Sequence, residues 1–330
     1  MNVLVTGGAG YIGSHAVKAL IEAGHRVTVV DNLDRGHKRA VHEKATLEPV
    51  DLRQTGELTT VLQRDAIECV MHFAALAYVG ESVDHPLRYY DNNATGSLSL
   101  LRAMHAAGVR RMVFSSTCAT YGIPEQMPIV ETMPQQPINP YGWSKLFVER
   151  MLADVAAADP GFGFTALRYF NVAGCAADGT IGEDHDPETH LIPVMLEAAL
   201  GKRDVITIFG EDYPTPDGTC IRDYIHVEDL VEAHILAMNA LHDGDARFYN
   251  LGIGRGYSVR EMIEAAKAVT GVDFKVEIGP RRPGDPPELY ANADRIREDL
   301  GFRPRYTDIR HIIETAWNWF KAHPEGYEKK

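Results

Sequence analysis

The sequence lacks any long apolar run. None of its 330 residues lies in a stretch approaching the ~18 consecutive apolar residues that a membrane-spanning helix needs. A basic region followed by a short apolar core, which marks a secretion signal, is also missing, because the chain starts at once with a β-type segment. We therefore expect a cytoplasmic protein that neither spans a membrane nor is secreted.

Cysteine and positive charge are both scarce. The four cysteines are spread across the chain, which fits neither a disulfide framework nor a zinc cluster. Lys and Arg number 33 against 46 Asp and Glu, and the formal net charge of -13 opposes binding to nucleic acid or to an anionic membrane. An anionic ligand must therefore find local positive charge.

Glycine is abundant at the start of the chain. A short β-rich run, residues 3–6, is followed by Gly7, Gly8, Gly10 and Gly13, where a strand must turn sharply into a helix. Glycine tolerates positive φ and lets the backbone approach a ligand closely. Residues 14–22 then show a helical period, and the free amides at the start of such a helix bind a pyrophosphate. This order predicts a dinucleotide site.

An acidic residue closes the next predicted strand. Residues 26–30 read as a second buried strand, and Asp31 follows it directly. A carboxylate at this position binds the ribose diol of a dinucleotide and repels a 2′-phosphate. The sequence therefore favours NAD over NADP.

Strands and helices alternate through the first half of the chain. Residues 69–75, 111–116 and 165–168 have the composition of buried parallel strands, with a helix near 90–107 between the first two. This rhythm predicts an α/β fold built on a doubly wound parallel Rossmann sheet. The alternation of strands and helices is lost after about residue 171, where Gly and Pro become frequent.

We expect two domains, of which the second is discontinuous. The first is an NAD-binding Rossmann domain at 1–172, to which a helical segment near 225–243 returns. The second is a smaller α/β domain that binds the substrate, made of residues 173–224 and 244–330.

A second motif carries the chemistry. Asn139 and Pro140 suit the start of a helix, so Tyr141 and Lys145 project from one helical face. A tyrosine with a pKa of about 10 is a poor base at neutral pH, but a nearby ammonium group and an oxidised nicotinamide both favour its phenolate. Lowering that pKa by ~3 units takes roughly 4 kcal/mol. Tyr141 is therefore the predicted catalytic base, tuned by Lys145.

Three hydroxyl groups lie at the end of a predicted strand. Ser115, Ser116 and Thr117 stand where substrate chemistry occurs in this architecture, and a hydroxyl there relays the substrate proton to the phenolate. Without them, Tyr141 and Lys145 would describe an ordinary amphipathic helix whose Lys reaches solvent. The three elements together favour catalysis on an alcohol.

Eight blocks of the sequence resemble the UDP-glucose 4-epimerase family of extended short-chain dehydrogenases and reductases. They are residues 7–15, 31–33, 73–75, 80–83, 89–93, 141–145, 168–171 and 222–227. The resemblance implies an isomerase that interconverts UDP-glucose and UDP-galactose. Tyr141, aided by Thr117, removes the proton of the 4-hydroxyl while the hydrogen on carbon 4 passes as hydride to NAD. The transient 4-keto sugar turns over in the cleft, and the hydride returns to its other face.

The resemblance also implies the residues of the site and a homodimer. Those that hold NAD are Gly7, Gly10, Tyr11, Ile12, Gly13, Asp31, Asn32, Leu33, Arg35, Gly36, Asp51, Leu52, Phe73, Ala74, Ala75, Asn92, Ser115, Tyr141, Lys145 and Phe170. Those that hold the UDP-sugar are Thr117, Tyr141, Asn171, His190, Leu191, Thr207, Ile208, Phe209, Arg222, Tyr224, Arg282, Asp285 and Leu289. Arg222 and Arg282 supply positive charge for the diphosphate, since a guanidinium group forms paired bonds to phosphate. The dimer would form through helices at 90–107 and 141–158.

Three positions depart from the family pattern. Ala77 stands where a Lys is often found, so one contact to NAD is lost or replaced. His190 stands where an Asn often precedes Leu191. Leu289 aligns with a bulky Tyr of some members, and a smaller side chain leaves room beside carbon 2 of the sugar. We therefore expect N-acetylated UDP-hexosamines to be substrates as well.

Two other functions fit the same architecture. A nucleotide-sugar 4,6-dehydratase or decarboxylase carries carboxylates after its catalytic Thr, whereas Cys118, Ala119 and Thr120 follow Thr117 here. A non-catalytic NAD-binding sensor usually loses the Tyr or the Lys, and this chain has both. An acidic, histidine-containing stretch at 183–190 lacks convincing zinc spacing, so we expect a polar loop over the substrate and no metal.

Overall fold

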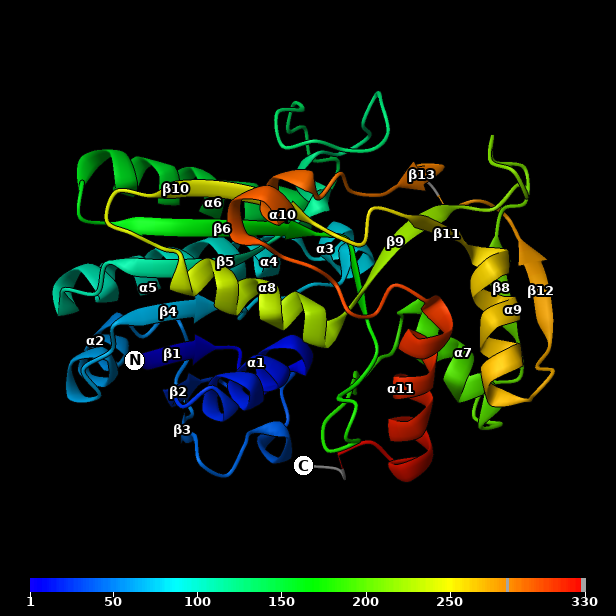
Figure 1. The fold of residues 1–330 in the computed structure, drawn as a ribbon, viewed down its shortest axis with the longest axis horizontal. Helices are drawn as coiled ribbons and strands as arrows, with labels where there is room; N and C mark the ends of the chain where they lie inside the picture. Colours follow the sequence, from blue (N-terminus) through cyan, green and yellow to red (C-terminus); the bar gives the residue numbers. More distant parts are fainter. Residues whose placement is uncertain (283–284, 328–330) are drawn as a thin grey trace.

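A seven-stranded parallel sheet is the centre of the larger of two units in the computed structural model (Figure 1). The structure describes residues 1–282 and 285–327. The strand order is β10-β6-β5-β4-β1-β2-β3. The strands are β1 (Asn2–Thr6), β2 (Arg26–Val30), β3 (Thr46–Glu48), β4 (Cys69–His72), β5 (Arg111–Thr117), β6 (Gly163–Tyr169) and β10 (Ala246–Leu251). Every pairing between neighbours is parallel, so the predicted doubly wound sheet is confirmed.

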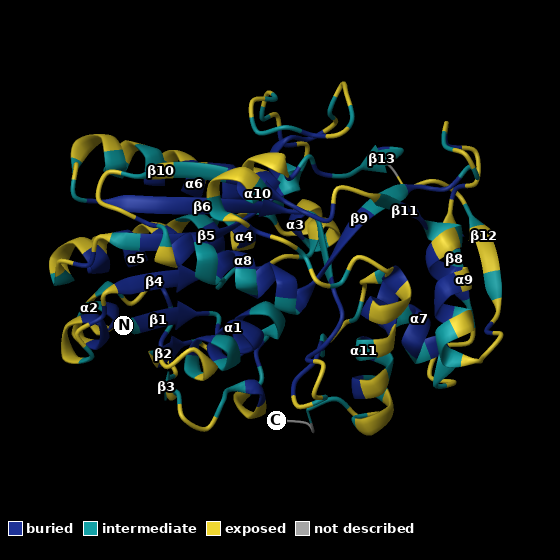
Figure 2. Ribbon diagram, viewed as in Figure 1, coloured by how far each residue is buried: buried dark blue, intermediate teal, exposed yellow. Residues whose placement is uncertain are grey.

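Helices cover both faces of this sheet. The helices around it are α1 (Tyr11–Glu22), α2 (Thr55–Arg64), α5 (Gly96–Ala107), α6 (Pro140–Ala158), α8 (Val227–Asn239) and α10 (Asp294–Leu300). Val3 and Val5 of β1 pack into a core with α1 and α8, while Leu4 packs into a second core with α2, α5 and α6. The central strands are therefore buried on both sides (Figure 2), which explains their continuous apolar sequences.

Two predicted elements differ in detail from the structure. The strand expected at 69–75 ends at His72, because β1 pairs with β4 only as far as Thr6 and both strands then turn into loops. The helix expected from residue 90 begins with a π-helical segment, η2 (Tyr90–Thr95), before α5 continues it. Both differences lie at the edge of the sheet where a ligand would bind.

The rest of the chain forms a smaller unit with its own core, on the right of Figure 1. Its strands are β7 (Asn171–Ala173), β8 (Ile206–Phe209), β9 (Ile221–His226), β11 (Gly256–Ser258), β12 (Val276–Gly279) and β13 (Glu288–Leu289). Its helices are α7 (Leu191–Ala199), α9 (Val259–Thr270) and α11 (Ile309–Ala322). The amphipathic α11 buries Trp319 in this core.

The remaining elements are short. They are α3 (Val79–Asp84), α4 (Pro86–Tyr89) and the 3-10 turns η1 (Lys38–Ala40) and η3 (Cys118–Thr120). Among all the helices in the described parts of the chain, none has the length and the apolar character needed to cross a membrane.

The chain returns to the large sheet after β9. Helix α8 packs in the same core as α1, and β10 then pairs with β6 from Ala246 and Phe164 to Leu251 and Tyr169. The sequence places this return at 225–243, whereas the pairing of β10 extends it to Leu251. Because β10 is an edge strand whose first half is partly exposed, it lacks the apolar run by which the central strands are recognised. The other domain boundaries stay a prediction.

Candidate active site

A cleft of about 1310 Å³ runs between the large sheet and the smaller unit. One end is lined by the loops that follow β1, β2 and β4, and the other by residues of β8, β9 and β13. Ser115 and Thr117, at the carboxyl end of β5, line it between these ends. A ligand across the carboxyl ends of the strands is the arrangement that this architecture predicts.

Leu33 and Tyr141 are the two predicted site residues that do not line the cleft; the others all do. Leu33 has a positive φ of 59°, and its N–H donates to Asp31 Oδ1 at 2.8 Å, so it orients a residue that does line the cleft. Tyr141 forms a hydrogen bond with the side chain of Thr117. Each exception therefore contacts the cleft through a neighbour.

The glycines after β1 form a cradle that side chains would fill. Gly7 has a φ of +71°, and a Cβ atom there would lie 2.6 Å from Ala74 N. At Gly13, a Cβ atom would overlap the main-chain oxygen of Gly7. By contrast, only Gly7 O, at 3.4 Å, lies near a Cβ built at Gly10. Helix α1 starts here without a side-chain cap, so its first amides are suited to a pyrophosphate.

Asp31 is held in place at the end of β2. Its Oδ2 accepts a hydrogen bond from Ala9 N at 3.0 Å, which joins it to the glycine turn. Next to it, Asn32 Nδ2 donates to Asp51 Oδ2 at 2.9 Å, and Arg53 holds the pKa of the Asp51 carboxyl well below its usual range. An anchored carboxylate beside an anion cradle fits the ribose and pyrophosphate of NAD. Ala77 also lines this end of the cleft.

Helix α6 positions the predicted catalytic side chains. Asn139 caps it, since its Oδ1 accepts a hydrogen bond from Gly142 N at 2.8 Å, and Pro140 occupies the first turn as expected. Lys145 lies one turn beyond Tyr141, is 3% exposed, and donates from Nζ to the main-chain oxygen of Ser115 at 2.8 Å. The helix is thereby joined to the end of β5.

Burial dominates the electrostatics of this pair. It raises the pKa of Tyr141 to about 12, against the hydrogen bond with Thr117, which lowers it. It also lowers the pKa of Lys145 to about 7, against the negative charge of Glu149, which raises it. The chain's own residues therefore do not produce the lowered tyrosine pKa that the sequence suggests. A positive charge on a bound group would lower the pKa of Tyr141.

A buried ion pair supports α6, and sequence reasoning missed it. Glu149 accepts two hydrogen bonds from Arg168 of β6, at 2.9 Å from Nε and 2.7 Å from Nη2. Ser116 Oγ donates to the same carboxylate, next to Thr117. One signal was available, because Glu149 lies one helical turn beyond Lys145 on the same face. The pair fixes α6 against β5 and β6.

Two arginines share one carboxylate at the other end of the cleft. Asp285 Oδ1 lies 3.6 Å from Arg222 Nη2, and its Oδ2 accepts a hydrogen bond from Arg282 Nε at 2.9 Å. The Arg282 guanidinium also lies over the Phe209 ring, 4.9 Å from its centroid. Leu289 of β13 pairs with Arg222 of β9. This end therefore offers the local positive charge that an anionic ligand needs.

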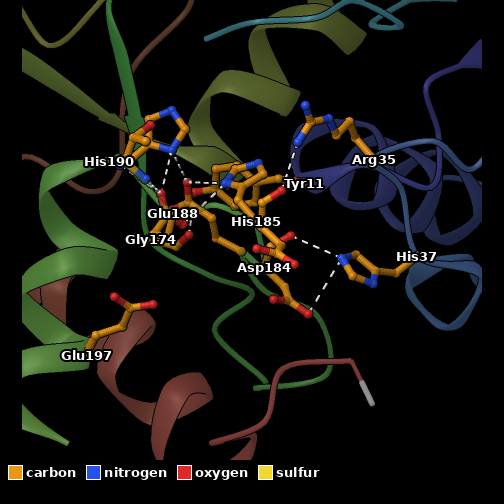
Figure 3. A network of polar contacts seen from close by, with 12 residues as sticks. Tyr11, Arg35, His37, Gly174, Asp184, His185, Glu188, His190 and Glu197 are labelled. Carbon is orange, nitrogen blue, oxygen red and sulfur yellow. Dashed lines mark hydrogen bonds and ion pairs between the residues drawn. The ribbon is translucent and has the colours of Figure 1, made fainter. Parts of the chain in front are cut away.

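The loop before α7 is more buried than its polar sequence suggests. Residues 183–190 form neither helix nor strand, as expected, but the side chains of Glu183 and Glu188 are each only 5% exposed. His185 and His190 lie against these carboxylates, and Figure 3 shows the network around Glu188. His190, a predicted substrate residue, is therefore part of a cluster next to Leu191.

Comparisons with known proteins agree with this arrangement. Residues 3–252 match the model of the NAD-dependent epimerase/dehydratase family. The chain is 51% identical over 331 residues to a UDP-glucose 4-epimerase of Lactobacillus helveticus, covering 100% of both chains.

Two solved structures are also similar. A crystal structure of a UDP-glucose 4-epimerase has a TM-score of 0.96 and 50% identity, with 100% of both chains covered. The structure of a UDP-Glc/GlcNAc 4-epimerase from Campylobacter jejuni has a TM-score of 0.85 and 43% identity, covering 97% of this chain and 99% of that one. The family model matches most of the chain and the identity to these relatives extends over its whole length, so the chain belongs to the NAD-dependent epimerase/dehydratase family.

Proposed function

We propose that this protein interconverts UDP-glucose and UDP-galactose by transient oxidation at carbon 4 of the sugar. The observation that carries the proposal is the position of Thr117 and Lys145, which line one cleft between a nucleotide cradle and an arginine-rich end, with Tyr141 next to Thr117. Full-length identity of about half to an enzyme with this activity supports the same conclusion.

In this mechanism, Tyr141 Oη takes the proton of the sugar 4-hydroxyl, and Thr117 holds that hydroxyl in line. Gly7, Gly10 and Asp31 would hold NAD, which when bound would supply a hydride acceptor and a positive charge. The tyrosine gives the proton back after the 4-keto sugar has turned over. Lys145 keeps α6 at the fixed distance from β5 that this exchange needs.

The arginine end would bind the diphosphate. Arg222 and Arg282 already lie beside one carboxylate, so an incoming diphosphate would meet two oriented guanidinium groups. Anchoring the nucleotide there leaves the sugar free to rotate near Thr117. Such rotation is what presents both faces of the ketone to the same hydride site.

N-acetylated UDP-hexosamines belong to the proposed substrate range. Leu289 lines the cleft, and its side chain is smaller than the tyrosine that some family members carry there. The similar Campylobacter jejuni protein is described as a UDP-Glc/GlcNAc 4-epimerase, which supports a pocket of this size in a related chain. Turnover of UDP-glucose without any turnover of UDP-N-acetylglucosamine would contradict this part.

A homodimer is also proposed, through α5 and α6. Trp143 and Phe147 are 39% and 43% exposed on α6, and their rings lie 5.8 Å apart. The Tyr90 ring lies at the same distance from the Phe147 ring, tilted against it, and Leu98 of α5 is exposed as well. An exposed apolar surface of this kind is typically buried against a partner protein. Light scattering should give twice the mass of one chain, and Phe147→Asp should give a monomer.

A cytoplasmic location is the remaining proposal. All four cysteines are free, and three of them are buried, as is typical of a chain kept in a reducing compartment.

The direct test is to incubate the purified protein with UDP-galactose and measure UDP-glucose. Epimerisation predicts that both sugars are present at equilibrium with no change in total hexose. A dehydratase would instead form a keto-deoxy sugar, and a sensor would bind NAD without forming a product. The η3 turn after Thr117, which is Cys118 to Thr120, carries no acid for dehydration.

A further inference from the structure

Four side chains of the loop before α7 surround a common point. Glu183, His185, Glu188 and His190 each offer one ligand atom, and these atoms all lie within 4.8 Å of one another. His190 is a predicted substrate contact, and the other three residues precede it in the loop. None of the four belongs to the reacting centre. We propose that this cluster is a binding site for a divalent transition-metal ion, with Zn²⁺ as the reference ion.

The distances around His185 fit one central ion better than separate ion pairs. His185 Nδ1 lies 3.3 Å from both Glu183 Oε1 and Glu188 Oε2. A single proton on that nitrogen can point along only one of these directions. Charge-assisted N–H···O bonds are also shorter, at about 2.7–2.9 Å. The carboxylates therefore converge on the nitrogen from two sides without pairing closely with it.

The second histidine also lies between the two carboxylates, with one longer and one shorter contact. His190 Nδ1 lies 3.3 Å from Glu183 Oε1 and 2.9 Å from Glu188 Oε1. In a tetrahedral zinc site with bonds of about 2.0–2.1 Å, neighbouring ligand atoms are about 3.3 Å apart. Three of the four nitrogen–oxygen distances match this spacing, and the fourth, from His190 Nδ1 to Glu188 Oε1, is shorter. Small side-chain shifts would let all four residues bind one ion without a water ligand. Closed sites of this kind are structural.

The chemistry of the donors selects the class of ion. Two neutral imidazoles and two carboxylates balance a charge of +2, and mixed nitrogen and oxygen ligands suit Zn²⁺ and its neighbours better than Mg²⁺ or Ca²⁺. The two carboxylates are 5% exposed and lie against the two imidazoles, so a metal ion would replace imidazole protons as the positive charge beside them.

Aromatic rings and main-chain contacts hold the loop in this form. The Tyr78 ring lies 6.0 Å from the His185 ring and 6.1 Å from the His190 ring. Arg35 Nη1 donates to Asp186 O at 2.8 Å, and His37 Nε2 lies 3.1 Å from Asp184 O (Figure 3). The loop therefore joins the cofactor end of the cleft to the start of α7. A bound ion would stabilise this connection without taking part in the chemistry.

The linear spacing hides this site. The four donors stand at 183, 185, 188 and 190, which matches none of the common zinc motifs, so the sequence alone predicts no metal. Only the fold of the loop brings them together. The inference is independent of the proposed epimerase activity, because it concerns metal binding alone.

Titration of the chelator-treated, untagged protein with Co²⁺ tests the proposal. We expect one Co²⁺ per chain, with the intense visible absorption of a tetrahedral site, displacement by Zn²⁺, and a higher melting temperature with either ion. In the double variant His185→Ala/His190→Ala, binding should weaken by far more than the roughly tenfold loss that removing an outer-sphere partner causes.

Two further variants keep the test falsifiable. Glu188→Gln preserves the size of the side chain and should also weaken binding, with an unchanged circular dichroism spectrum. His242→Ala removes an exposed histidine outside the cluster and should bind Co²⁺ like the parent protein. The proposal is overturned if the parent binds no Co²⁺ at one per chain, or if the double variant binds it equally well.

Discussion

The Lys145 ammonium group donates its hydrogen bond to the main-chain oxygen of Ser115, 2.8 Å away. This contact joins helix α6 to the end of β5, two residues before Thr117. The same lysine is therefore a structural link as well as a charge. Because burial places the pKa of Tyr141 at about 12 and that of Lys145 at about 7, the two groups are poor partners until a further positive charge arrives.

The depressed pKa of Lys145 predicts how stability depends on pH. Below pH 7 the lysine is charged in both the folded and the unfolded chain, and the full cost of burying its charge opposes folding. Between pH 7 and its model value of 10.5 the unfolded chain binds more protons, so the free energy of unfolding should rise with pH. The slope from this group is at most about 1.4 kcal/mol per pH unit.

Urea unfolding of the cofactor-free protein and of Lys145→Met measures this effect. The parent should gain stability relative to the variant as the pH rises from 7 to 9.5, because Met has no proton to lose. A difference that stays constant over this range would show that the lysine keeps its usual pKa in the folded protein.

The buried ion pair predicts a large loss of stability in Arg168→Met. The substitution leaves Glu149 charged and uncompensated in the core, which should lower the free energy of unfolding by about 3–5 kcal/mol. Arg150→Met, an exposed position on helix α6 next to Glu149, is the control and should change the free energy of unfolding little. Equal effects of the two substitutions in chemical denaturation would contradict this role.

The glycine cradle predicts that Gly13→Ala loses NAD. The new Cβ atom would overlap Gly7 O, so the turn must open and NAD affinity should fall by at least about tenfold, or about 1.4 kcal/mol. Gly56→Ala is the matched control, since its Cβ meets nothing within 4 Å. Calorimetric titration with NAD compares the two, and equal affinities would contradict the close approach of backbone and cofactor.

The proposed width of the sugar pocket predicts a change of specificity in Leu289→Tyr. A phenol ring beside carbon 2 should lower kcat/KM for UDP-N-acetylglucosamine by at least about tenfold, with UDP-glucose little affected. Coupled assays of both sugars give the ratio. A parallel loss for the two substrates would mean that residue 289 affects folding or the shared nucleotide end.

Periodicity and glycine placement predict most of the large sheet, because its strands are buried on both faces. For this reason the apolar pattern predicts both ends of β2, Arg26–Val30, and the cap at Asn139 follows from local chemistry. The edge strand β10 was not recognised, since an edge strand carries a mixed pattern.

The site shows the same division. Motif residues along the glycine turn and on α6 are predicted because each depends on near neighbours in the sequence. Glu149 has a local signal in its place on α6, but its pairing with Arg168 depends on how α6 packs against β6. The residues of the cluster at 183–190 are near neighbours in the sequence, but their convergence depends on the fold and the burial of the loop.

The most direct test of the account is the rate of UDP-galactose conversion by Tyr141→Phe. If the Tyr141 hydroxyl transfers the proton of the substrate, kcat should fall by at least about a hundredfold, while NAD content and melting temperature stay close to those of the parent. Conversion at the parental rate, with NAD still bound, would contradict the account.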